Sequence, residues 1–127
     1  KQYIKNGLFL YVIPSLLILF LFNFTKLSAQ EINWIEVANT NNHIQWIDVN
    51  SIKYKQSGFL TVLTKYAEIN TDDNTNINTN SYLMAIDCEN RLFSKLPLNG
   101  ELKQVKNWIK PNNDKLIKTT IVNSCLY

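Results

Sequence analysis

Two cysteines, Cys88 and Cys125, offer the clearest chemistry in this sequence. A redox-active cysteine usually has a partner two residues away or positively charged surroundings. Cys88 has neither, and it lies between Asp87 and Glu89, whose carboxylates disfavour a thiolate. The pattern therefore favours a structural disulfide between Cys88 and Cys125, with two free thiols as the alternative. A zinc site is less favoured, because the chain has one histidine and no CxxC pair.

The other polar groups form no recognisable catalytic or metal-binding motif. His43 follows a predicted turn, and no spacing places a nucleophile or a carboxylate beside it, as catalysis would require. The acidic and amide residues from Asp72 to Asn78 invite comparison with a calcium loop. Counting from Asp72, however, Ile77 stands where an EF-hand requires glycine and Leu83 where it requires glutamate. We therefore predict no catalytic residues, no metal and no cofactor.

Three tryptophans are candidates for a binding surface: Trp34, Trp46 and Trp108. Aromatic side chains can contact sugars or peptides, but in a small domain they more often belong to the core. We expect Trp34 and Trp108 to be core residues and keep Trp46 as the candidate surface residue. Three lysines near the C-terminal region could form a basic edge, but we favour a solvated face for them: Lys103, Lys106 and Lys110.

Hydrophobic alternation predicts an antiparallel sheet. Strands are expected over residues 32–38, from Ile44, over 59–69, from Tyr82 and over 91–96. The 59–69 strand carries apolar side chains on both faces, so we place it in the centre of the sheet. A tight turn is expected at Asp48–Ser51 and a polar loop over 70–80.

A helix is expected after the cap residues Asn112, Asn113 and Asp114. Its apolar face would include Leu116, Ile117, Thr120, Ile121 and Ser124. Because several of these residues are β-branched, helix propensity is weak and a strand is the alternative. In a helix, Cys125 would lie at the end and could reach Cys88 on the sheet.

Residues 1–29 have the layout of a secretory signal peptide. Lys1 and Lys5 precede an apolar run from Leu8 to Phe22, and small residues Ser28 and Ala29 precede the expected cut. The alternative is an uncleaved membrane anchor, although the run is shorter than the roughly 20 residues that span a bilayer. Export to a secreted, periplasmic or cell-surface location would favour disulfide formation. Gln30 stands where a lipoprotein signal requires cysteine, so this position cannot carry a lipid.

The remaining residues, 30–127, fit one small domain. The signal contains three of the 13 basic side chains and none of the 10 acidic ones, so the domain has a formal net charge of zero. This balance gives no electrostatic case for binding nucleic acid or an anionic membrane, and it makes homodimer formation a mild expectation.

Several short elements occur in a recognisable order: Trp34, Trp46-Ile47-Asp48, Ile86-Asp87-Cys88 with Arg91, Trp108-Ile109-Lys110-Pro111 and Cys125. This order resembles the small bacterial surface-adhesin protein E-like domains over residues 34–127. The resemblance implies an antiparallel sheet with a C-terminal helix held by the Cys88–Cys125 disulfide. It also implies adhesion, since the named members bind host extracellular proteins.

These observations predict an exported α+β domain that acts as a non-enzymatic binding module of the bacterial periplasm or cell surface. Its partner would be an unidentified protein or envelope ligand. A membrane-tethered structural or assembly component, with the N-terminal segment uncut, is the second hypothesis. An enzyme is the third.

Overall fold

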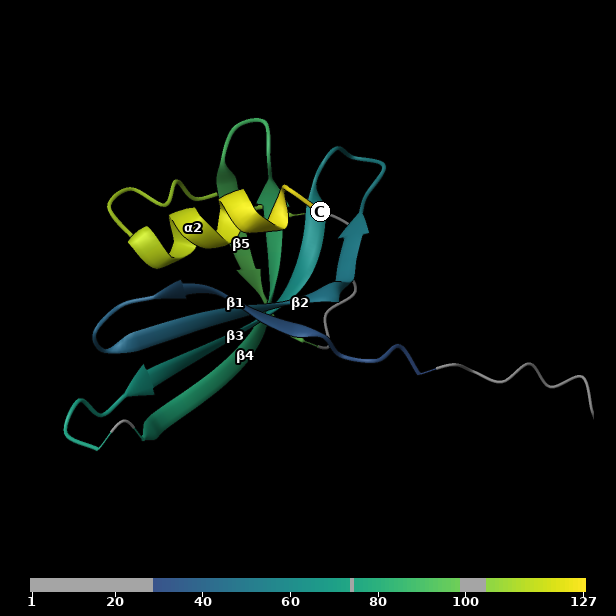
Figure 1. Cartoon of the computed structure of the whole chain (residues 1–127). Coiled ribbons are helices and arrows are strands. Elements are labelled where there is room, and N and C mark those ends of the chain that lie inside the picture. Colours follow the sequence, from purple (N-terminus) through teal and green to yellow (C-terminus); the bar gives the residue numbers. More distant parts are fainter. Residues whose placement is uncertain (1–28, 74, 99–104) are drawn as a thin grey trace, which may run out of the picture.

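The computed structural model describes residues 29–73, 75–98 and 105–127, so the predicted signal peptide lies outside the described residues apart from Ala29. The described chain forms an antiparallel sheet followed by a helix (Figure 1). The elements are β1 (Trp34–Asn39), β2 (His43–Tyr54), β3 (Leu60–Ile69), β4 (Asn76–Asp87), β5 (Leu92–Leu96) and α2 (Lys115–Ser124). The predicted α+β class and the helical rather than extended C-terminus are confirmed.

Each strand pairs with its neighbour in sequence, in the order β1-β2-β3-β4-β5. β3 lies in the centre, as its apolar residues on both faces predicted. After β5, the chain returns to the sheet edge, where Phe93 and Ile109 exchange backbone hydrogen bonds of 3.0 and 2.9 Å. The connection from β2 to β3 requires Gly58, whose φ of +90° is unfavourable for residues with a side chain.

The tight turn predicted at Asp48–Ser51 is wrong, because these residues lie inside the continuous strand β2. The pairing of β2 with β3 is interrupted there: Asp48 lies opposite Leu63, but the next paired residue, Lys53, lies opposite Thr61. The side chain of Asp48 does accept from the backbone N–H of Asn50, two residues on, at 3.1 Å. The local hydrogen bond was therefore predicted correctly, but it stabilises a large bulge instead of a chain reversal.

The polar loop predicted over residues 70–80 is shorter than expected, because β4 begins at Asn76. The backbone of residues 76–80 pairs with β3 and extends the hairpin away from α2 (Figure 1). The side chains of residues 78–80 are exposed to solvent, so backbone pairing with β3, and not a core, holds this part of the strand. Composition alone therefore underestimated the length of the strand.

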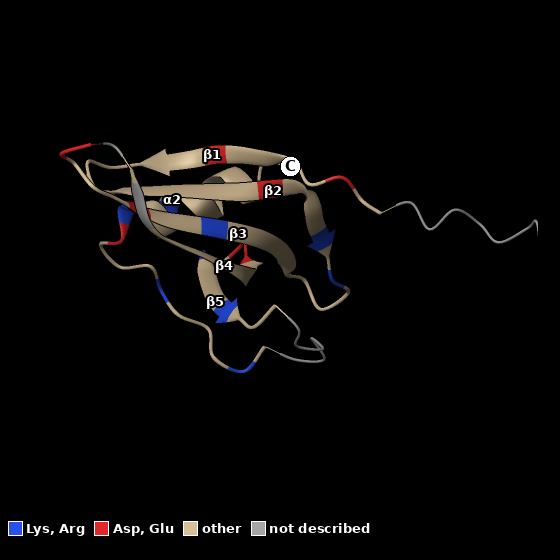
Figure 2. Cartoon of the chain, turned by 90° about the horizontal axis from the view of Figure 1, so that it is seen from below, with Lys and Arg blue, Asp and Glu red and all other residues tan. Residues whose placement is uncertain are grey.

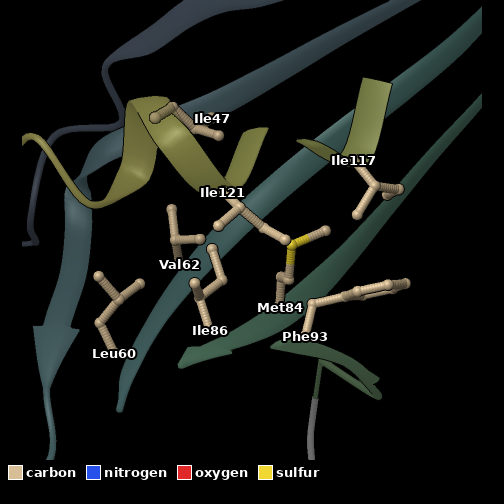
Figure 3. Packing of buried hydrophobic residues seen from close by; sticks show 8 residues of the cluster. All are labelled: Ile47, Leu60, Val62, Met84, Ile86, Phe93, Ile117 and Ile121. Carbon is tan, nitrogen blue, oxygen red and sulfur yellow. The ribbon is translucent and has the colours of Figure 1, made fainter. Parts of the chain in front are cut away.

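The core lies between α2 and one face of the sheet (Figure 3). From the helix, Ile117 and Ile121 point toward the sheet and are 3 % and 2 % exposed. The sheet contributes Ile47, Leu60, Val62, Met84, Ile86 and Phe93. Apolar burial of this extent is the main stabilising contribution in a small domain.

The start of α2 agrees with the predicted cap. Asp114 has an extended backbone, and its carboxylate accepts from the backbone N–H of Ile117 at 3.0 Å. This bond satisfies one of the N–H groups that have no partner inside the helix. The buried residues Ile117, Thr120, Ile121 and Ser124 all belong to the face that periodicity predicted.

Candidate binding surface

One face of the sheet points away from α2, and we call it the open face. In β3, Leu60 and Val62 belong to the core between the sheet and the helix. Because neighbouring residues in a strand point to opposite faces, Leu63 and Lys65 point the other way. Figure 2 is a view from below, in which α2 lies behind the strands. The strands carry few charged residues in this view.

Trp34, Trp46 and Lys65 form a cluster on the open face. Trp46 on β2 lies directly opposite Lys65 on β3 in the antiparallel register. The Nζ of Lys65 is 4.6 Å from the ring centre of Trp34 and 4.8 Å from that of Trp46. The ammonium group therefore makes cation–π contacts with both indoles, each of which contributes about 0.5–1 kcal/mol when partly solvated. All three side chains are partly exposed.

A groove of about 310 Å³ lies farther along the open face. Its walls include Leu63 and Leu83, which oppose each other on β3 and β4, together with Lys53 and Leu98. Leu98 is 59 % exposed. The open face therefore offers partly exposed aromatic rings, exposed apolar surface and lysine side chains.

Asp48 also lines the groove, but the residue is only 4 % exposed and its carboxylate is used inside the fold. Its Oδ1 accepts from the backbone N–H groups of Asn33 at 2.8 Å and Asn50 at 3.1 Å. Ser51 spans the bulge: its hydroxyl donates to the carbonyl of Asp48 at 2.6 Å and accepts from the N–H of Leu63 at 2.8 Å. These bonds hold the groove wall in place and give Asp48 a structural role.

The predicted disulfide is present between Cys88, just after β4, and Cys125, the C-cap residue of α2. The two Cα atoms are 5.9 Å apart, and both cysteines pack against the core. The bond connects the end of the helix to the sheet.

The sequence profile of the surface adhesin-E family matches residues 35–127. The chain belongs to the surface adhesin-E family. The matched region contains Trp46, Lys65 and both cysteines. Membership implies a cell-surface or exported protein. No curated protein and no solved structure gives a significant match.

In this adhesin-E chain, His43 does not belong to the cluster of Trp34, Trp46 and Lys65 on the open face. It begins β2, and its ring stacks on Tyr66 with centroids 5.4 Å apart. Residues 39–42 and Lys115 surround it in a polar depression. In the described ranges, no three His, Cys, Asp or Glu side chains come together as a metal site. No helix in these ranges is long and apolar enough to cross a membrane.

The acidic residues singled out in the sequence form local turns. The side-chain amide of Asn90 donates a hydrogen bond to the carboxylate of Asp87, and so does the backbone N–H of Asn90. These two bonds, the side-chain bond first, lower the pKa of the Asp87 carboxyl. Similarly, the hydroxyl and backbone N–H of Thr75 lower the pKa of Asp73. In both cases the hydrogen bonds favour the charged form.

The expectation that Trp34 and Trp108 are core residues is wrong, because the core cluster contains neither side chain. Trp34 contacts Lys65 on the open face, and Trp108 packs edge-on against Phe59 with ring centroids 5.6 Å apart. The sequence analysis also missed Lys65. The available signal was a lysine in the middle of the strand predicted to be central, since a charge there must reach solvent or a partner.

Proposed function

We propose that this chain is an exported, non-enzymatic binding module of the bacterial cell surface or periplasm, and that the open face is its contact surface for a protein ligand. The observation that carries the proposal is that Trp34 and Trp46 both lie within cation–π distance of Lys65 and outside the core cluster. The description of the family as surface adhesins supports a binding role and favours a non-enzymatic one.

The packing supports recognition over simple stabilisation. Aliphatic side chains and Met84 build most of the core, so the two indoles are not needed to fill it. Tryptophan is enriched among the residues that dominate protein–protein binding energies, because its large ring buries much apolar area. The ammonium of Lys65 partly covers these rings and could exchange its cation–π contacts for a carboxylate of a ligand.

The surface therefore suits a protein segment that presents an apolar or aromatic side chain next to a carboxylate. The apolar group would pack on Trp34 and Trp46, while the carboxylate would pair with Lys65. The neighbouring groove, with Leu63, Leu83 and Leu98 in its walls, would extend the apolar contact.

Binding to immobilised extracellular matrix proteins and to bacterial envelope fractions tests the proposal. The test variant is Trp46→Thr, which removes the indole while keeping a residue that favours strands. Tyr54→Thr is the matched control: it removes an aromatic ring from the same strand, where the side chain is 65 % exposed and outside the cluster. Circular dichroism would verify that both variants fold.

We expect Trp46→Thr to weaken binding by about 30-fold, the effect of losing a dominant interface side chain of about 2 kcal/mol. Tyr54→Thr should change the affinity by less than about twofold. The proposal is wrong if the wild-type protein is not retained at micromolar concentration, or if the two variants weaken binding equally.

A further inference from the structure

We infer that a second groove, beside α2, binds a small amphipathic anion: a carboxylate or phosphate group carried on an apolar chain or ring. This groove is distinct from the open face and has a volume of about 500 Å³, within the range of small-molecule sites. The turn between β4 and β5, the segment that precedes α2, and α2 itself form its walls.

Each of the three walls contributes one cation: Arg91 from the turn, Lys110 from the preceding segment and Lys118 from the helix. Among the residues that the structure describes, no acidic side chain lines the groove. Since residues 30–127 have a formal net charge of zero, this concentration of cations does not simply reflect a basic protein. The folded chain thus creates a local positive potential that would attract an anion.

The apolar lining argues against a purely inorganic anion. Pro111, Ile121 and Val122 contribute to the same groove. Ile121 belongs to the core, whereas Val122 is 49 % exposed beside the cations. An apolar group would remove Val122 from water, and the attached anion would remain near Arg91 and Lys118.

The backbone provides independent support. Among the described residues, Arg91 and Asn112 are the two non-glycine residues with positive φ, at 54° and 47°, and both line this groove. Asparagine tolerates this conformation, but arginine does so poorly. Arg91 is also the only arginine of the chain. Glycine would suit the turn better, so the charged side chain fits a role in binding better than a role in the turn.

The test is a fluorescence titration of the purified exported protein with 1-anilinonaphthalene-8-sulfonate, which joins an anion to an apolar ring system. N-phenyl-1-naphthylamine, which has the same rings without the sulfonate, is the neutral comparison. We expect saturable binding of the sulfonate and at least about tenfold weaker binding of the neutral probe, because the cations cannot contribute.

Two variants test the location of the site. Arg91→Gly removes one charge and relaxes the turn, so misfolding is not expected to explain its effect. Lys118→Gln removes a second charge from the exposed side of α2. Each should weaken binding of the sulfonate by about threefold, as expected for a partly solvated ion pair. Lys53→Gln is the control, because Lys53 lines the groove on the open face.

Displacement of the probe by decanoate and by decyl phosphate would distinguish the two head groups, and displacement by either supports the inference. Three results would overturn it: equal affinity for the charged and neutral probes, equal affinity of Arg91→Gly, Lys118→Gln and Lys53→Gln, or no displacement by either compound.

Discussion

Cys125 is the C-cap residue of α2, and its disulfide to Cys88 joins the end of the helix to the end of β4. The two residues are 37 positions apart in the sequence, so the bond closes a long loop that includes β5 and the connection to the helix. The core between the helix and the sheet is small, and this covalent link therefore contributes a large share of the stability.

Replacing both cysteines, in Cys88→Ala/Cys125→Ala, should lower the free energy of unfolding by about 4 kcal/mol, because the unfolded chain regains the freedom that the loop restricts. Urea denaturation followed by tryptophan fluorescence would measure the change. Wild-type protein under reducing conditions is the control and should show a similar loss. A decrease below about 1 kcal/mol would contradict the role assigned to the bond.

Removing the hydroxyl of Ser124 should raise the free energy of unfolding, whereas removing the disulfide lowers it. Its hydroxyl is fully buried and, within the described residues, has no hydrogen-bond partner. Ser124→Ala removes this unsatisfied group and places a better helix former in α2, so the free energy of unfolding should rise by about 1 kcal/mol. Thermal or urea unfolding measures the difference.

Thr64→Val is the matched comparison for Ser124→Ala. Thr64 is also fully buried, but its hydroxyl donates to the backbone carbonyl of Tyr82 at 2.9 Å. Loss of this satisfied bond should reduce stability by about 1 kcal/mol. If both variants are destabilised equally, the hydroxyl of Ser124 has a partner in solution, such as a bound water.

Tyr82 should make stability depend on alkaline pH. Burial raises the pKa of its hydroxyl, and hydrogen bonds with Thr64 and Gln45 offset part of the rise. The pKa in the folded state therefore lies above the unfolded value of about 10. The stabilising contribution is fully present below pH 10 and is lost as the pH rises from there through the folded pKa.

Urea midpoints measured between about pH 8 and pH 11.5 would show this loss. In Tyr82→Phe the decline over this interval should be shallower, because the buried group that must ionise has been removed. An equally steep decline in the variant would assign the pH dependence to other groups.

The N-terminus supplies a prediction about processing. Protein expressed in a bacterial host with its own leader should begin at Gln30 and gain about two mass units on reduction of the disulfide. Intact mass spectrometry with and without reductant measures both. An uncut chain recovered in the membrane fraction would favour the tethered alternative over a released binding module.

Local patterns in the sequence were sufficient for the elements that depend on nearby residues. Hydrophobic alternation predicted the strand from Tyr82, which lies within β4, and Asp114 with the following periodicity predicted α2. These predictions succeeded because a strand face repeats every two residues and a helix cap is made within one turn. The disulfide followed from the number of cysteines together with the expected compartment.

The candidate surfaces depended on tertiary structure. Trp46 meets Lys65 because of the register between β2 and β3, and the bulge after Asp48 changes that register along the strand. A shift of one residue would have placed the side chain of Trp46 on the other face of the sheet. Likewise, Arg91, Lys110 and Lys118 come together only when the helix packs on the sheet and brings three segments to one groove. The sequence by itself therefore determined the local elements and the cross-link, whereas long-range pairing and packing decided which side chains meet.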